Sequence, residues 1–580
     1  MLNQQISDIF AEMADIMEIL AEDPFRINTY RKVSRIISDS SQDIASLAAA
    51  GTLEEIPGIG KSTAAKIHEF VHTGKIEAHQ DLLKKIPSGL LELLKIPGIG
   101  PKGVASLWKG LKVQNINDLQ KAIDSHILEN LPGFGEKKAQ SLAKGIAFLQ
   151  STRGRILLCH AEAIAEHIIS QLLTAIPKVK IEIAGSLRRG RETIGDIDLL
   201  AQAPDSEKLI ETFTHLSGIQ QVTAAGDTKA SILYSDPEIC SDFVQIDLRV
   251  ISKESMGAAW QYFTGSKAHN VRLREIAVKK KLKLNEYGLF QGEKQIAGKV
   301  EAEVYEKLGL TFVPPTLRED RGEIELAQNN NLPPILSLSD IRGDLHMHSP
   351  ESDGRATIED LAMAALLLNY EYIAITDHSK SSVIANGLDT KRLLKHIQNI
   401  KKINDSLKNF TILAASEVDI LADGSLDYPD EILQQLDFVM ASVHSGMTGD
   451  KEKLTARLCH AMESPYVNCI GHPTGRMLNI RDAMQLDMAQ IIRTAAQTHT
   501  ALEVSSNPLR LDLNDIHCRM AIDAGVKLII NTDAHDVYGL RDMRYGVTTA
   551  QRGWVRKSDV LNCQPLSVLR KWIDQKRKSR

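Results

Sequence analysis

Hydrophobic and polar positions change their period along this chain, and the changes divide it into three regions. Over residues 1–150, apolar residues recur at helical spacing between short Gly-containing turns, which predicts an all-helical region. Residues 151–320 combine a helical stretch at 155–175 with apolar runs such as "DIDLLAQ" and "FVQIDLRVI", which indicates an α+β region. After the uncharged, Asn- and Pro-rich residues 326–338, strands and helices alternate regularly, which favours a parallel barrel or sheet.

Composition narrows the class of protein. The 580 residues are 43% apolar and 25% charged, which is ordinary for a soluble globular chain of several domains. The net charge of −5 gives no overall basic field, so DNA binding would depend on local patches, of which residues 251–300 are the clearest. Six cysteines without a CxxC pair indicate a reduced protein, and no signal peptide or membrane span is evident. We therefore expect a cytoplasmic protein.

A short motif recurs three times in the helical region. Each copy places an apolar residue and Pro-Gly-x-Gly before a helix rich in small residues: "IPGIGKSTAAKI", "IPGIGPKGVASL" and "LPGFGEKKAQSL". Glycines let backbone N–H groups approach a ligand closely, and a helix N-terminus favours an anion. We therefore expect a sequence-neutral clamp on phosphates. The predicted contact residues are Gly58, Gly60, Gly98, Gly100, Gly133 and Gly135.

This motif resembles the helix-hairpin-helix DNA-binding motif, most strongly in its first two copies. The resemblance implies that hairpin carbonyls can hold K⁺ or Na⁺ beside a DNA phosphate. In this sequence those carbonyls belong to residues around Ile56, Ile59, Leu94, Ile96 and Ile99.

The segment "AGSLRRGRETIGDIDLL" carries the first candidate for catalysis. Asp196 and Asp198 lie two apart on a predicted strand, so both carboxylates face one side, and Asp247 can join them from a neighbouring strand. Three carboxylates on one face repel one another unless a cation lies between them, and such oxygen ligands suit Mg²⁺. Two ions held in this way can clamp both oxygens of a phosphoryl displacement. Gly185 and Ser186 precede the pair on a turn that could bind a triphosphate.

These residues resemble the nucleotidyltransferases of DNA polymerase family X, the polymerase-beta relatives, over about residues 1–320. The segments "YFTGSKAHNVRLREIA" and "LNEYGLF" extend the similarity. The resemblance implies a metal triad of Asp196, Asp198 and Asp247, with DNA and dNTPs as substrates. It further implies nucleotide contacts through Arg155, Gly185, Ser186, Arg189, Tyr262, Phe263, Gly265, Asn270 and Arg274. Gln245 and Lys267 depart from the animal enzyme, which has an arginine and an acid at those positions.

Lys66 follows the first hairpin and has two interpretations. It aligns with the lysine that forms a Schiff base with 5′-deoxyribose phosphate in animal relatives. A lysine behind a phosphate-binding turn more often acts only through its charge, and we favour that interpretation over lyase chemistry.

The last region holds a second candidate site. Nine possible ligands follow or end its apolar strands: His346, His348, Asp353, His378, Glu417, His444, His472, Asp533 and His535. In a parallel barrel the carboxyl ends of the strands share one rim, where active sites gather. Nine donors suffice for two or three metal ions, and mixed imidazole and carboxylate ligands suit Zn, Mn or Fe.

The series "HMHS…SDG…TDHS…SE…SVHSG…GHPTG…NTDAH" resembles the polymerase-and-histidinol-phosphatase (PHP) domain over about residues 339–580. The resemblance implies a distorted seven-stranded (βα) barrel whose metal centre hydrolyses phosphoesters. In similar proteins this domain is a Mn²⁺-dependent 3′–5′ exonuclease, and some cut abasic DNA. Arg510 and Arg541 are weaker candidates for phosphate contacts. We expect the basic tail "KWIDQKRKSR" to be solvated, with a DNA contact as the alternative.

Together these observations predict a multidomain α+β and α/β chain that acts as a monomer. The expected parts are a helical domain at 1–80, a second helical DNA-binding subdomain at 81–150, a nucleotidyltransferase palm at 151–253, a subdomain for the nascent base pair at 254–325, a linker at 326–338 and a PHP domain at 339–580. The predicted activity is gap-filling DNA polymerisation in repair, together with exonuclease action. Alternatives are a PHP domain that is a small-molecule phosphatase or a structural metal module, and a non-catalytic DNA-binding scaffold.

Overall fold

The computed structural model describes residues 2–38, 44–56, 58–96, 99–152 and 154–578. The chain forms two compact units, residues 1–153 and 154–580, and each is described by itself. Among the described residues, no helix is long and apolar enough to cross a membrane.

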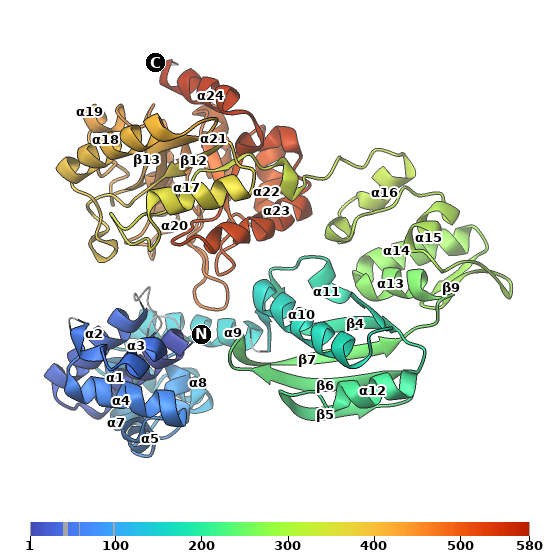
Figure 1. Cartoon of the computed structure of the whole chain (residues 1–580), viewed down its shortest axis with the longest axis horizontal. Helices are drawn as coiled ribbons and strands as arrows, with labels where there is room; N and C mark the ends of the chain where they lie inside the picture. The colour runs from blue at the N-terminus through green and yellow to red at the C-terminus, as the bar shows by residue number, and fades with distance from the viewer. Residues whose placement is uncertain (1, 39–43, 57, 97–98, 153, 579–580) are drawn as a thin grey trace. The chain divides into compact units, whose positions relative to one another are not determined.

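The first unit is helical, as its sequence period predicts (Figure 1). Its helices are α1 (Leu2–Leu20), α2 (Pro24–Ser38), α3 (Ile44–Ala50), α4 (Lys61–Thr73), α5 (Glu77–Leu83), α6 (Gly89–Leu93), α7 (Pro101–Leu111), α8 (Ile116–Asp124) and α9 (Glu136–Thr152). One continuous core runs through them, from Ile6 and Phe10 on α1 to Leu142 and Ile146 on α9. This core holds the three hairpin helices α4, α7 and α9 in one body.

The second unit begins with a five-stranded sheet in the order β2-β4-β7-β6-β5. Its elements are β1 (Ile156–Leu157), α10 (Leu158–Ala175), β2 (Lys180–Ile183), α11 (Gly185–Arg188), β3 (Thr193–Ile194), β4 (Asp196–Gln202), α12 (Ser206–Thr214), β5 (Ile219–Ala225), β6 (Lys229–Asp236) and β7 (Cys240–Val250). Helices α10 and α12 share a buried core with the sheet. The central strands β4 and β7 run parallel, which brings the carboxylates of both strands to one edge.

A smaller α+β subdomain follows the sheet. It contains α13 (Met256–Thr264), α14 (Lys267–Lys279), a three-stranded antiparallel sheet of β8 (Lys283–Asn285), β9 (Gly288–Gln291) and β10 (Lys294–Ala297), then α15 (Glu301–Lys307) and α16 (Glu323–Gln328). The expected linker at 326–338 begins within α16, and its Leu336 is fully buried in the core of the next domain. The segment between these points has neither helix nor strand.

The last domain is a barrel of seven parallel strands in sequence order. Its strands are β11 (Gly343–Asp344), β12 (Tyr372–Ile375), β13 (Thr411–Asp419), β14 (Phe438–Ser442), β15 (Cys469–Ile470), β16 (Ala501–Ser505) and β17 (Leu528–Asn531). A parallel bridge between Met347 and Ala534 links the chain after the first and last strands, so the sheet nearly closes on itself. This is the strand–helix alternation that the sequence predicts.

Helices lie around the barrel strands (Figure 1). They are α17 (Ile358–Leu367), α18 (Thr390–Ser406), α19 (Asp430–Leu433), α20 (Lys451–Glu463), α21 (Met488–Gln497), α22 (Asp515–Asp523), α23 (Met543–Arg552) and α24 (Leu566–Lys578). One core lies between strands and helices, and a second, inside the barrel, includes Tyr372, Phe438 and Met440.

The prediction of a solvated C-terminal tail is wrong for Trp572, Ile573 and Lys576, which are buried. Leu569, Trp572 and Ile573 on α24 are buried in the core inside the barrel. The Lys576 ammonium group is buried as well, and it donates to the carbonyl oxygen of Met462 at 3.1 Å. The apolar spacing of i, i+3 and i+4 on this helix outweighs its basic composition.

Polar contacts join the barrel to the palm and to the subdomain that follows it, within the second unit. Arg476 donates to both carboxylate oxygens of Glu192, at 3.2 and 2.6 Å. Arg552, which is 4% exposed, donates to Glu319 at 2.9 Å, to Asp515 at 2.8 Å and to the Arg189 carbonyl at 2.8 Å. Because buried guanidinium groups need several acceptors, such contacts fix how the two parts meet.

Candidate metal centres and DNA-binding turns

Three carboxylates meet on one face of the palm sheet, on the neighbouring strands β4 and β7. Asp198 on β4 lies opposite Asp247 on β7 in the parallel register, and Asp196 lies two residues before Asp198 on the same face. Burial, followed by the charges of Asp196 and Asp247, raises the pKa of Asp198 to about 7. The raised pKa means that the charged form of Asp198 is unfavourable here, and a bound cation would stabilise it. Carboxylate oxygens are ligands that suit Mg²⁺. The residues present therefore fit the predicted ion.

Asp247 is positioned by its neighbours. The Gln245 side-chain amide donates to Asp247 Oδ1 at 3.0 Å. The ammonium of Lys229 and the guanidinium of Arg249 lie 3.8 and 3.9 Å from Asp247 Oδ2. The arginine that Gln245 replaces is thus compensated by a hydrogen bond and by two cations on adjacent strand positions.

Gly185 begins the turn that faces this triad. Its φ is +64°, and a Cβ atom added there would lie 2.3 Å from Asp198 Oδ2. Only glycine meets both conditions, because a side chain would be strained and would collide with the carboxylate. Ser186 is the next residue of α11.

The predicted arginine ligands of the triphosphate have protein partners in this structure. Arg155 donates through Nε to Thr193 Oγ1 at 3.0 Å. Arg189 donates through Nε to Glu319 Oε1 at 3.1 Å, across the boundary between palm and subdomain. Their contacts with a nucleotide stay predictions, since each would have to share or exchange these partners.

The predicted sugar and base contacts surround the end of α13. The rings of Tyr262 and Phe263 lie edge to face with centroids 5.1 Å apart. Gly265 has φ +68° at the helix end, and Asn270 donates to the carbonyl oxygen of Tyr262 at 2.7 Å. Arg274 is exposed on α14. The roles of these residues toward a nucleotide stay predictions.

The nine predicted donors of the barrel gather at the carboxyl ends of its strands. They form four overlapping groups in which ligand atoms lie within 4.8 Å of one another, and the palm triad is not among such groups in the described residues. The groups are His348, Asp353, His378 and His535; His346, Glu417 and His472; His346, His348 and Asp533; and His378, Glu417 and His444. Sharing of residues between groups is the arrangement expected of a cluster of ions.

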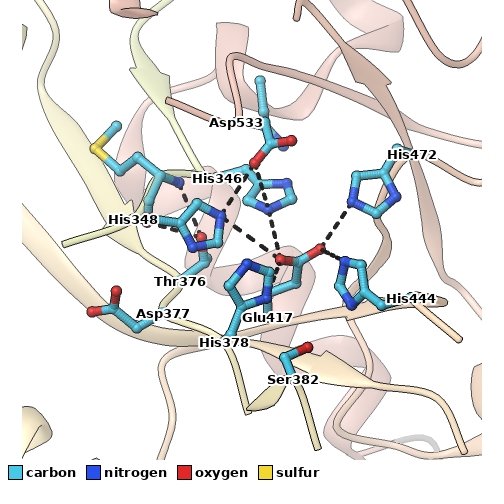
Figure 2. Close-up of polar contacts among 12 residues, drawn as sticks. His346, His348, Thr376, Asp377, His378, Ser382, Glu417, His444, His472 and Asp533 are labelled. Atoms are coloured by element: carbon cyan, nitrogen blue, oxygen red, sulfur yellow. Dashed lines mark hydrogen bonds and ion pairs between the residues drawn. The ribbon is translucent and has the colours of Figure 1, made fainter. Parts of the chain in front are cut away.

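Glu417 lies at the centre of these groups (Figure 2). Its Oε1 is 3.2 Å from His444 Nε2 and 3.0 Å from His472 Nε2. Its Oε2 is 3.0 Å from His378 Nδ1 and 3.4 Å from His346 Nε2. Burial raises the pKa of Glu417, but the surrounding imidazoles outweigh burial and hold this pKa well below its usual range. A single carboxylate therefore faces histidines from four strands.

The donor atoms satisfy a test for metal binding. Five buried atoms of the cluster make no hydrogen bond of acceptable geometry among the described residues, although some lie close to one another: His346 Nε2, His348 Nδ1, His378 Nδ1, Glu417 Oε2 and His472 Nδ1. Buried polar atoms are almost always paired in native proteins, so such a concentration of exceptions indicates absent ligands. Imidazole and carboxylate donors fit Zn, Mn or Fe.

Two carboxylates that sequence reasoning missed orient the ligands. Glu503 on β16 accepts from His346 Nδ1 at 2.8 Å, and Asp419 at the end of β13 accepts from His444 Nδ1 at 2.6 Å. Each contact fixes the imidazole tautomer and leaves Nε2 toward the cluster. A signal was present for both: Glu503 is the only acid in the apolar strand "ALEVS", and Asp419 follows the predicted ligand Glu417 by two residues in "SEVDI".

A cavity of about 530 Å³ opens over the cluster. Its walls include seven of the nine donors and Arg510; the donors are Asp353, His378, Glu417, His444, His472, Asp533 and His535. Arg510 Nε lies 3.6 Å from Asp533 Oδ2, which places a cation beside the cluster. Arg541 is not among the lining residues and lies instead near the Tyr538 ring. The size suits a small ligand or one nucleotide of a larger one.

The three Gly-containing turns share one backbone hydrogen bond. In each turn, the backbone N–H of the apolar residue between the two glycines donates to the carbonyl oxygen three residues earlier. These bonds run from Ile59 to Ile56 at 3.0 Å, from Ile99 to Ile96 at 3.3 Å and from Phe134 to Leu131 at 2.9 Å. Gly58 and Gly133 have φ of +101° and +87°. Gly98 lies outside the described residues.

The helix after each turn begins without a side-chain cap. Gly60 and Gly100 are the N-cap residues of α4 and α7, and Gly135 accepts the first bonds of α9. Because glycine has no side chain, the first N–H groups of these helices stay available for an anion. Lys66 on α4 donates instead to Ser62 Oγ at 3.0 Å, and its Schiff-base role stays a prediction that borohydride trapping would test.

These sites define a class of protein. A polymerase-beta-type palm and subdomain carry a carboxylate triad, helix-hairpin-helix turns precede them, and a histidine-rich parallel barrel follows. Family descriptions match each part: "Helix-hairpin-helix domain" at 1–76, "SAM-like Helix-hairpin-helix tandem" at 90–147, "DNA polymerase beta palm" at 155–235, "DNA polymerase beta thumb" at 259–319 and "PHP domain" at 344–507.

Full-length similarity identifies the family. The chain is 36% identical over 571 residues to the DNA polymerase/3′-5′ exonuclease PolX of Bacillus subtilis (strain 168), and the match covers 98% of each chain. This chain therefore belongs to the PolX family. It is also 26% identical over 236 residues to a probable phosphatase of Shewanella sediminis, covering 39% of this chain and 91% of that protein. A probable phosphatase of Thermoanaerobacter sp. is 24% identical over 246 residues, or 40% of this chain and 95% of that one.

Proposed function

We propose that this protein adds nucleotides to a DNA primer at the palm and removes 3′-terminal nucleotides at the barrel. The substrate of both activities would be gapped or primer–template DNA, and dNTPs would serve the first. The observation that carries the proposal is that two complete sets of ligands, of different chemistry, occur in one chain of the PolX family.

At the palm, Asp196, Asp198 and Asp247 would hold Mg²⁺. When bound, the ions would neutralise the triphosphate and favour ionisation of the primer 3′-hydroxyl. Gln245, Lys229 and Arg249 keep Asp247 in place. The turn at Gly185 and Ser186 would offer backbone N–H groups to the triphosphate. In the reaction, the 3′-oxygen bonds to the α-phosphorus as the bond to pyrophosphate breaks.

At the barrel, the nine donors would hold two or three ions, with Mn²⁺ or Zn²⁺ as the candidates. When bound, the ions would lower the pKa of a water molecule towards neutrality. Glu503 and Asp419 hold the ligand imidazoles, and Arg510 would balance the charge of the scissile phosphate. Hydrolysis forms a bond from the water oxygen to phosphorus and breaks the bond to the penultimate 3′-oxygen, which releases a nucleoside monophosphate.

In the first unit, the uncapped helix N-termini would bind DNA phosphates, and K⁺ or Na⁺ would bind at turn carbonyls. This assignment explains why a phosphoesterase barrel accompanies three hairpins: both centres need a polynucleotide. We propose that the protein acts as a monomer.

The second candidate function is a phosphatase barrel joined to a polymerase, which the resemblance to probable phosphatases favours. A labelled single strand with Mn²⁺ separates the two. The proposed function predicts ladder-like shortening from the 3′ end that is lost in His346→Ala. Turnover of a small phosphomonoester without shortening of the strand would contradict it.

A further inference from the structure

The loop between β12 and α18 carries two exposed apolar side chains at the edge of the metal cavity. Val383 is 79% exposed and Ile384 fully exposed, and both line the cavity together with the metal-binding residues. Single exposed apolar residues are common on protein surfaces. Two adjacent ones on the wall of this cavity need a reason, because the other lining residues are charged or polar apart from Ala385.

The loop is built to hold its shape. Ser381 donates through its N–H and hydroxyl to both carboxylate oxygens of Asp427, at 2.7 and 2.6 Å. Ser382 Oγ donates at 2.7 Å to Asp419, the residue that also orients His444, and Figure 2 shows Ser382 beside the cluster. The loop therefore shares an anchor with a metal ligand.

The end of the loop is fixed as well. Arg392 on α18 donates to the carbonyl oxygens of Asn386 and Gly387 at 3.0 and 3.2 Å. The Leu388 N–H donates to the His378 carbonyl at 2.8 Å. With both ends tied, the two apolar side chains cannot fold back into the core, so their exposure is a fixed feature of the cavity.

We propose that Val383 and Ile384 form a contact surface for a nucleobase beside the scissile phosphate, which makes the barrel selective for a polynucleotide end over a small phosphate ester. The inference rests on the proposed exonuclease. A nucleobase presents an apolar face that gains from leaving water, whereas the sugar and phosphate do not. Metal ions and Arg510 would hold the phosphate, so the base of an adjoining nucleotide is the group that can reach the apolar wall.

The test crosses a protein variant with a change in the substrate. The protein change is V383S/I384S, and L367S is the matched control, because Leu367 on α17 is 79% exposed and is not among the lining residues of this cavity. Three single strands are compared with Mn²⁺: one ending in thymidines, one with an abasic tetrahydrofuran at the terminal position, and one with it at the penultimate position. The readout is kcat/KM for release of the terminal nucleotide.

The double variant should lose about tenfold in kcat/KM on the thymidine strand, the factor expected when about one aliphatic side chain leaves a contact. On one of the two abasic strands, it should match the wild-type protein, since the base that it would contact is already missing. L367S should match the wild type on all three strands.

An equal loss on all three strands would overturn the proposal, because the loop would then only support the metal cluster. No loss on the thymidine strand would overturn it too. A wild-type protein that shortens none of the strands would contradict the exonuclease itself, which is a distinguishable result.

Discussion

Replacing Glu503 with glutamine should weaken metal binding at the barrel, although Glu503 is not itself one of the nine predicted metal ligands. The carboxylate accepts three hydrogen bonds: from His346 Nδ1 at 2.8 Å, from the Asn531 amide at 2.9 Å and from the His472 N–H at 2.5 Å. Glutamine has one acceptor oxygen and one amide that donates. In either orientation of the glutamine side chain, its NH₂ group would face an N–H group that now donates to Glu503.

The magnitude follows from the two orientations. If the glutamine oxygen keeps the bond to His346, the bond to His472 is lost; if it turns, His346 loses the partner that fixes its tautomer. Hydrogen bonds to charged groups contribute about 1.5–3 kcal/mol each. Loss of an outer partner of a metal ligand typically costs about 10–100-fold in metal affinity. We expect a decrease within that range for E503Q.

The assay is competition for Mn²⁺ against a chelator of known affinity, with exonuclease and polymerase rates measured on the same samples. Exonuclease activity should require more Mn²⁺ in E503Q, and polymerase activity should be unchanged. D523N is the control, because Asp523 is 58% exposed and pairs only with Arg519 among the ion pairs of the described residues. Equal metal affinity in E503Q and D523N would refute the role given to Glu503.

Two further predictions concern the palm. G185A should abolish primer extension and leave the exonuclease intact, because the added Cβ would lie 2.3 Å from Asp198 Oδ2. The control G292A should retain both activities, since Gly292 also has a positive φ, of +60°, but has open space around it. Primer extension by G185A would contradict the placement of this turn. R552M should lower the free energy of unfolding of the second unit by about 2–4 kcal/mol, as measured by denaturant titration, because Glu319 of the subdomain and Asp515 of the barrel lose a buried partner. A change below about 0.5 kcal/mol would show that Arg552 does not join the barrel to the subdomain.

The barrel site was predictable because its ligands are tied to a repeating pattern. Each apolar run ends near a histidine or an acid, and parallel strands in sequence order bring those ends to one rim. Glu503 was missed because it precedes the end of its strand, so the same rule did not select it. Its burial and its three donors appear only when β16 packs between β15 and β17.

The contacts between barrel and palm could not be predicted. The residues that make them, such as Arg476 with Glu192, are 284 positions apart and have no local pattern. The burial of the C-terminal helix was missed for a similar reason. Its basic composition suggested an exposed helix, but its apolar residues pack into the barrel core. Long-range packing decides such cases, and local sequence carries little of it.

The most direct test of the central claim is a gapped duplex with a mismatched 3′ primer end, incubated with dNTPs, Mg²⁺ and Mn²⁺. The wild-type protein should remove the mismatch and fill the gap. D247A should only shorten the primer, and H346A should not remove the mismatch but should extend a matched primer at the wild-type rate. Primer extension by D247A, or removal of the mismatch by H346A, would contradict the assignment of one activity to each metal centre.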